Sequence, residues 1–165
     1  MIFGMTILTF VHVLLSLLGI LAGLVVMFGL LTSRPSKGWT AAFIWTTVAT
    51  SATGFLFPFH RFLPSHAVGI LSLLVLTIAI YALYGKHLTG SWRKAYAVNA
   101  MIALYLNVFV LIAQLFAKVP ALKALAPTQS EAPFKEAQLV ALLAFVVLTI
   151  LAAFKFRGQP AQQPL

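Results

Sequence analysis

The chain has 165 residues, of which 62% are hydrophobic and only 8% are charged, whereas about a quarter of the residues in a soluble domain carry charge. Its net charge is +9 and it contains no cysteine, which excludes disulfide exchange, thiolate catalysis and zinc–cysteine sites. The basic residues lie between or after long apolar runs, a pattern typical of membrane topology rather than of nucleic-acid binding. We therefore expect the lipid bilayer as a partner and no nucleic acid.

Five apolar runs are long enough to cross a bilayer as helices, which takes about 20 residues each. Backbone polar groups must be satisfied within the hydrocarbon, and the runs lack the alternation typical of porin strands. We predict an all-α integral membrane bundle formed by residues 1–156, followed by a disordered tail at 157–165. Its predicted spans cover residues 5–31, 39–59, 67–84, 95–117 and 137–156, with the first four forming a four-helix bundle and the fifth at its side.

The basic residues also predict the direction of the spans, because cytoplasmic loops carry an excess of Lys and Arg. One side has seven such residues and the other has four: Arg34, Lys37, Lys86, Arg93, Lys94, Lys155 and Arg157 against Arg61, Lys118, Lys123 and Lys135. We predict a multi-pass protein of the bacterial inner membrane with its N-terminus outside and its C-terminus cytoplasmic. The first span has no basic segment before it and is longer than a signal-peptide core, so it is expected to be retained.

Polar residues of four spans should meet at the outer end of this bundle, because neighbouring spans run in opposite directions. His12 lies about 10 Å inside the first span at 1.5 Å per residue, and an ionisable residue within a membrane is a functional-site candidate. The candidate ligand-binding residues are His12, Thr50, Thr53, His60, Arg61, His66, Asn107 and Gln114. The threonines and amides have an alternative role, since both can simply hydrogen-bond helix carbonyls or neighbouring helices.

The run FPFHRFLPSH, residues 57–66, places His60, Arg61 and His66 between two apolar spans. It is either a polar hinge at the membrane interface or part of a cap over the predicted pocket. The longest loop, residues 118–136, contains the two acidic residues of the chain, Glu131 and Glu136. Within it, Leu122 and Leu125 suggest a short interfacial helix, and Pro133 is typical of a helix start.

Several classes of function are compatible with these features. No carboxylate lies within a span, and no hydrolase or phosphate-binding motif is present, so we predict no catalytic residue and do not favour an enzyme. The first hypothesis is a structural, assembly or accessory partner of other membrane proteins, or a homo-oligomer. The second is a redox protein that binds haem b, with His12 and either His66 or His60 as axial ligands, or one linked to quinones. The third is binding or transport of a small neutral or anionic molecule that Arg61 attracts.

Three runs carry a resemblance that covers most of the chain from the second span onward. They are FHRF at residues 59–62, ALYLNVFVL at 103–111 and LAPTQSEAPF at 125–134. The chain resembles a group of small multi-span bacterial inner-membrane proteins of unknown function, a likeness that implies no particular activity. More loosely, His12, His60–Arg61 and His66 are similar to multi-span families with membrane histidines, some tied to b-type cytochromes or oxidase assembly. The paired mid-helix histidines of di-haem cytochromes are absent here.

Overall fold

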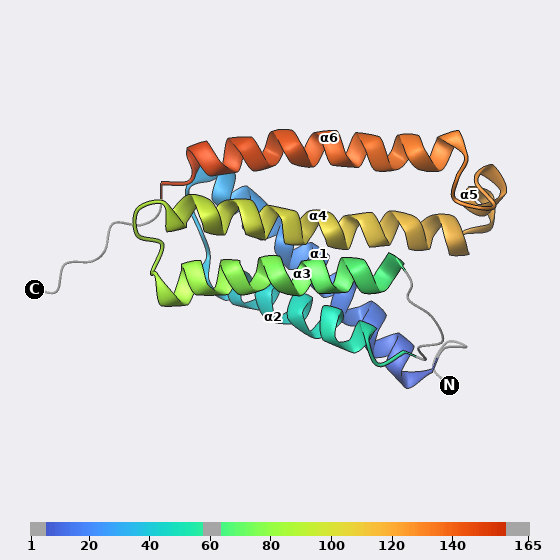
Figure 1. The fold of residues 1–165 in the computed structure, drawn as a ribbon, viewed down its shortest axis with the longest axis horizontal. Coiled ribbons are helices and arrows are strands. Elements are labelled where there is room, and N and C mark those ends of the chain that lie inside the picture. Colours follow the sequence, from blue (N-terminus) through green and yellow to red (C-terminus); the bar gives the residue numbers. More distant parts are fainter. Residues whose placement is uncertain (1–5, 58–63, 158–165) are drawn as a thin grey trace, which may run out of the picture.

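The computed structural model describes residues 6–57 and 64–157, and these residues form helices and connecting loops without strands. Figure 1 shows the helices packed side by side along one long axis. The elements are α1 (Ile7–Thr32), α2 (Lys37–Gly54), α3 (Pro64–Ile80), the π-helical turn η1 (Tyr81–Gly85), α4 (Trp92–Lys118), α5 (Pro120–Leu125) and α6 (Ala132–Lys155). The predicted short helix of the longest loop is confirmed as α5, and Pro133 stands in the first turn of α6 as predicted.

Four helices in the described part of the chain are long and apolar enough to cross a membrane: α1, residues 65–85 of α3 and η1, α4 and α6. The expectation of a helical membrane protein is confirmed to this extent. The second predicted span is not among the four, because α2, with five threonines and one serine among its 18 residues, is not apolar enough. It also ends at Gly54, before the predicted limit at residue 59; Phe55 and Leu56 then bond back to Ala52 and Thr53 in tighter turns.

Successive long helices run in opposite directions, which brings the start of α1, the end of α2, the start of α3 and the end of α4 to one end of the molecule (Figure 1). α5 and the start of α6 lie at that same end. α6 lies along α4, and only Gln138 and Ala152 of its residues are buried. α1 and α2 are inclined to the other helices, so the packing differs between the two ends of the bundle.

The hydrophobic core fills the opposite half of the bundle. In α1 every buried residue lies between Gly19 and Leu30, and none lies in the first twelve positions of the helix. We call this region the closed half; its core includes Val26, Leu30, Phe43, Ile44, Leu76, Ala79, Ala97, Ala100, Ala103, Leu104 and Phe156. Small side chains allow this packing. A Cβ on Gly23 would lie 2.5 Å from Leu104 Cδ1 and 2.9 Å from the Phe43 ring, so glycine permits the close approach of α1.

Polar contacts join the helix termini at the far end of the closed half, away from the start of α1. The guanidinium of Arg93 donates to the Arg157 carbonyl at 2.7 Å, and the Arg157 amide donates to Ser33 Oγ at 2.8 Å. These bonds join the ends of α1 and α6 to the start of α4. Lys86 lies over the rings of Tyr81 and Trp92, as a cation at a membrane interface can.

Candidate functional site

A cavity of about 560 Å³ occupies the other half of the bundle, which we call the open half. On α4 its lining extends from Leu106 to Lys118, about 18 Å along the helix at 1.5 Å per residue. The remaining walls come from the first half of α1, the end of α2 and the residues after it, and the first half of α3. Most of the lining is apolar. Its polar side chains are Thr9, His12, Ser16, Thr50, Ser51, Ser65, His66, Ser72, Asn107, Gln114 and Lys118.

Five of the eight predicted site residues line this cavity: His12, Thr50, His66, Asn107 and Gln114. They come from four different helices, so the alternating helix directions do bring them together. Thr53 is not part of the lining, but its hydroxyl oxygen lies 2.9 Å from His12 Nδ1. His60 and Arg61 lie outside the described residues.

The bond between His12 and Thr53 determines where the proton of the imidazole lies. The Thr53 hydroxyl oxygen is 2.8 Å from the Ala49 carbonyl oxygen and 3.1 Å from that of Thr50. A carbonyl can only accept, so the single hydroxyl proton of Thr53 is donated to these carbonyls. Thr53 must therefore accept from Nδ1–H of His12. In the neutral ring Nε2 then carries the lone pair, and no described residue makes a hydrogen bond to it.

Interhelical hydrogen bonds form the polar floor of the cavity, and all of them involve α2. Asn107 Nδ2 donates to Thr47 Oγ1 at 3.2 Å, and Ser51 Oγ donates to Ser72 Oγ at 3.0 Å. These bonds tie α2 to α4 and α3, while the His12–Thr53 bond ties it to α1. The amide nitrogen of Asn107 therefore bonds to a neighbouring helix, which is the alternative role predicted for the amides. Gln114 is instead exposed on the cavity wall.

Thr50 contributes a hydroxyl with no partner. Its side chain is 9% exposed, and its Oγ1 makes no hydrogen bond with any described residue. A buried hydroxyl without a partner costs about 1–3 kcal/mol, and most threonines on membrane helices avoid this by bonding to their own helix, as Thr46 does with the Ala42 carbonyl. Thr50 lines the cavity, but its Oγ1 atom is itself buried and offers no surface to a ligand.

The lining residues that sequence reasoning missed include Phe55, Phe57 and Lys118. The His12 ring meets the Phe57 ring edge-on at 5.2 Å between centroids, and the Phe55 ring packs on Gly69, where a Cβ would lie 3.2 Å from it. These contacts depend on how the chain turns after α2, which has no clear sequence signal. Lys118 could have been found, because it continues the face of Asn107 and Gln114 by one further turn of α4.

The described residues give haem ligation little structural basis. No group of three or more His, Cys, Asp or Glu side chains that could hold a metal ion occurs within 6–57 and 64–157, although a haem needs no more than two axial side chains. An axial ligand needs a ring edge open to the iron, and His12 offers one through Nε2. His66 is only 6% exposed, with the Phe55 ring 6.0 Å away, and His60 is not described. A pair of axial histidines remains a prediction.

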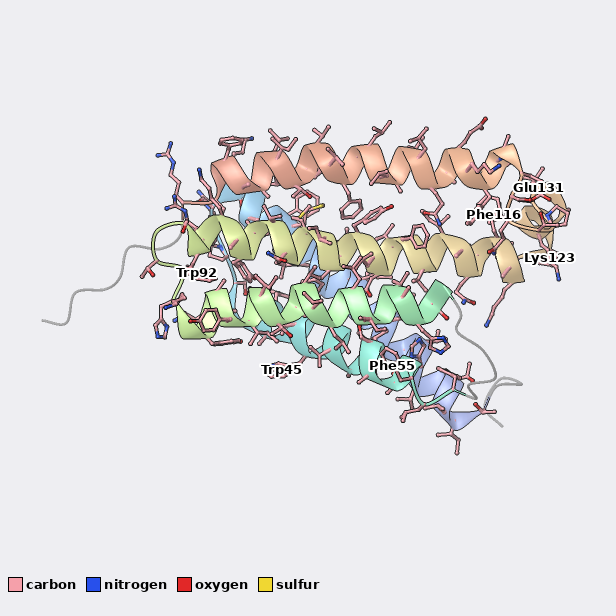
Figure 2. The ribbon with its side chains drawn as sticks, in the orientation of Figure 1. Trp45, Phe55, Trp92, Phe116, Lys123 and Glu131 are labelled. Carbon is pink, nitrogen blue, oxygen red and sulfur yellow. The ribbon has the colours of Figure 1, made fainter. Side chains whose placement is uncertain are left out.

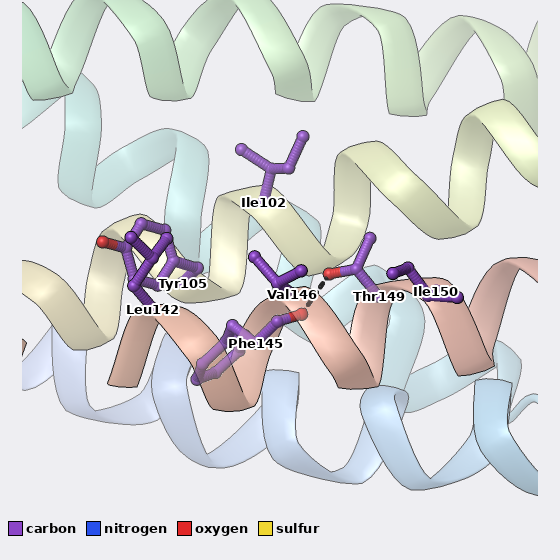
Figure 3. Close-up of a pocket in the computed structure, with 7 residues that line it drawn as sticks. All are labelled: Ile102, Tyr105, Leu142, Phe145, Val146, Thr149 and Ile150. Atoms are coloured by element: carbon purple, nitrogen blue, oxygen red, sulfur yellow. Dashed lines mark hydrogen bonds between the residues drawn. The ribbon is translucent and has the colours of Figure 1, made fainter. Parts of the chain in front are cut away.

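A second, smaller pocket of about 260 Å³ lies between α4 and α6 (Figure 3). Its walls are apolar, and the hydroxyl of Thr149 is already donated to the Phe145 carbonyl at 2.6 Å. The pocket could therefore accommodate an apolar group but has few polar groups to bind a ligand, in contrast with the larger cavity.

No known protein family, curated protein or solved structure matches this chain. The function must therefore be inferred from the chemistry of the cavity itself.

Proposed function

We propose that this protein is an integral membrane protein that binds a small amphipathic molecule in the cavity of the open half. The observation that supports it best is the composition of the wall: a mainly apolar surface of four helices with a few convergent polar groups. Such a combination is typical of small-molecule sites, where apolar walls provide contact area and a few polar groups fix orientation. The acceptor nitrogen of His12 is a group that a ligand would satisfy.

The charges of the wall favour a neutral or anionic ligand. No described lining residue is an aspartate or glutamate, and Lys118 stands at the end of α4 where the cavity reaches the end of the bundle. The cavity is also elongated along α4, from Asn107 to Lys118, which suits a molecule with a polar head and an apolar chain.

We further propose that α2 is a fifth span and that the open half faces outward in a bacterial inner membrane, with the N-terminus outside. At about 1.5 Å per residue α2 is about 27 Å long, close to the thickness of the hydrocarbon core. Its threonines and serine lower its mean hydropathy, but Thr47, Ser51 and Thr53 bond to side chains of other helices. Polar groups satisfied inside a bundle are compatible with a membrane span.

Binding can be tested with 4-decylphenol and the full chain in lipid nanodiscs, with affinities referred to the concentration of the probe in the lipid. Val110→Phe places a ring in the cavity, while Val146→Phe makes the same change in the pocket between α4 and α6. We expect saturable binding to the wild-type protein and the Val146 variant, and at least a tenfold loss in the Val110 variant. Equal binding to all three, or none to any, would overturn the proposal.

The topology can be tested with single cysteines, because the chain has none of its own. Ser36→Cys and Leu56→Cys place exposed thiols just before and just after α2. In intact cells an impermeant maleimide should label position 56 and reach position 36 only after permeabilisation. Labelling of both from one side would show that α2 does not cross, and the reverse pattern would invert the orientation.

A second candidate function, an accessory partner of other membrane proteins or a homo-oligomer, is supported by α6. The most apolar 18-residue window of α6 is 6% buried, against 28–39% in the other three candidate spans. Lipid or a second protein can cover this face. Purification in a mild detergent, with crosslinking before extraction, should recover a stable partner or a dimer if a protein covers it, and α6 variants such as Val147→Trp should then weaken the association.

A further inference from the structure

We infer that the cavity selects amphiphiles whose head presents a hydroxyl group, such as a phenol or an alcohol, over analogues that only accept hydrogen bonds. The inference rests on the proposed function, since it names the class of ligand for the same cavity. Its basis is that Thr53, a positioning residue outside the lining, holds His12 with the proton on Nδ1.

The proton arrangement follows from three distances at one oxygen atom. Thr53 Oγ1 lies 2.8 Å from the Ala49 carbonyl oxygen, 3.1 Å from the Thr50 carbonyl oxygen and 2.9 Å from His12 Nδ1. Two oxygens at 2.8 Å need a proton between them, and only the hydroxyl can supply it. The hydroxyl therefore accepts from the imidazole. In water the two imidazole tautomers exchange freely, but here the helical carbonyls of α2 fix one of them.

The consequence concerns the other nitrogen of the ring. Neutral His12 has an acceptor at Nε2 and no donor there, and no described residue occupies it. A ligand atom that meets Nε2 must therefore donate a proton to be bound. A carbonyl or ether oxygen in the same place would put two acceptors against each other inside a poorly solvated site, where an unsatisfied polar group is costly.

The rest of the wall complements such a head. Lys118 and the side-chain amide of Gln114 supply donors for an acceptor elsewhere on the ligand, and this amide makes no hydrogen bond with another described residue. Gln114 lies seven residues beyond Asn107 on α4, about 10 Å along the axis. The site thus has an acceptor on α1 and donors on α4. A molecule that carries both a hydroxyl and an acceptor can satisfy the two walls at once.

The test compares 4-decylphenol with its methyl ether, 4-decylanisole, which keeps the oxygen and the ring but lacks the proton. Measurements are made on the full chain in nanodiscs at pH 8, where an imidazole is ordinarily neutral, with each affinity referred to the probe concentration in the lipid. We expect the phenol to bind about tenfold more tightly, as the loss of one hydrogen bond to a half-buried acceptor implies. Thr53→Val should reduce the preference to less than about threefold, and Thr53→Ser, which keeps the hydroxyl, should restore it.

A spectroscopic measurement separates the tautomer from a general effect on folding. The ¹⁵N shifts of the His12 ring should report a protonated Nδ1 and an unprotonated Nε2 in the wild-type and Thr53→Ser proteins, and a mixture in Thr53→Val. Equal binding of phenol and ether to the wild type would overturn the inference and leave the proposed function intact, whereas failure of both probes to bind would overturn the proposed function. The inference about the ligand head would also be overturned by a protonated Nε2 in the wild type, or by an undiminished preference for the phenol in a folded Thr53→Val protein.

Discussion

The two halves of this bundle are made of the same four helices, yet one half is filled and the other is hollow. In the closed half, small residues such as Gly23, Ala100 and Ala103 let the backbones approach until Phe43 and Leu104 fill the space between them. In the open half, α1 and α2 are inclined away from α3 and α4 (Figures 1 and 2). The side chains there leave a cavity of about 560 Å³. The comparison teaches that the packing of a helical bundle can differ along its length. The filled half can stabilise the fold while the hollow half provides a binding site.

The largest expected effect compares two leucines on α4. Leu104 is 1% exposed in the closed half, whereas Leu111 lines the cavity. Leu104→Ala should lower the free energy of unfolding by about 2 kcal/mol, the lower end of the range for buried leucines, because in lipid the packing contribution remains and the transfer from water is largely absent. Leu111→Ala should cost about 0.5 kcal/mol, since space already exists beside it. Unfolding in mixed micelles measures both, and equal losses would contradict the distinction between the halves.

The next effect concerns glycine in the closed half. Gly23→Ala should destabilise by about 1–2 kcal/mol, because the new Cβ would lie 2.5 Å from Leu104 Cδ1 and 2.9 Å from the Phe43 ring. Gly38→Ala is the control, since no atom lies within 4 Å of its Cβ position and alanine favours helix.

The contact between Gly23 and Leu104 can be tested with a double mutant. When Leu104→Ala is combined with Gly23→Ala, the clash with Leu104 disappears, so the loss should be smaller than the sum of the two single changes. Strict additivity would show that Gly23 does not act through this contact.

A smaller effect is expected from the polar floor between the halves. Ser72→Ala removes the 3.0 Å hydrogen bond from Ser51 of α2. Hydrogen bonds between membrane helices contribute about 0.6 kcal/mol on average, and the same unfolding assay should find a loss near that value. Thr77→Ala is a suitable control, because its hydroxyl bonds only to the Leu73 carbonyl of its own helix. A loss above about 2 kcal/mol would place Ser72 among the main stabilising contacts of the bundle.

The smallest effect on stability is expected in the loop before α6, at the end of the molecule where the open half lies. The Thr128 hydroxyl donates to Glu131 Oε1 at 2.8 Å, and the amides of Thr128 and Ser130 also donate to this carboxylate, which holds the pKa of Glu131 below its ordinary value of 4.5. Because the folded pKa is lowered, the contribution to stability is complete above pH 4.5 and is lost as the pH falls through the folded value.

A carboxyl ¹³C titration of Glu131 measures this pKa directly. Thr128→Val removes the hydroxyl, which is the largest cause of the shift, and should raise the titration midpoint toward 4.5. An unchanged midpoint would show that the backbone amides alone hold the carboxylate. Binding in the cavity should not change in this variant, since neither residue lines it.

The sequence by itself determined the helical class, four of the membrane-length helices and the meeting of polar residues at one end. These follow from run length, from the need to satisfy backbone groups in lipid and from alternating helix directions. The burial of Ala100 and Ala103 and the position of Asn107 and Gln114 beside the cavity follow from one helical face of α4. Where sequence reasoning erred in detail, the cause was local: the second predicted span extends to residue 59, but α2 ends at Gly54, after which Phe55 and Leu56 bond back to Ala52 and Thr53.

Only the tertiary structure decided which polar groups are satisfied and which remain available to a ligand. Periodicity placed Thr50 and Thr53 on one helix, but it could not show that Thr53 accepts from His12 while Thr50 has no partner. Those roles depend on the distance between α1 and α2, which Gly19 and Gly23 permit through contacts with residues far along the chain. The physical reason is that a hydrogen bond depends on tenths of an ångström between helices, whereas a sequence pattern specifies only the face on which a residue lies.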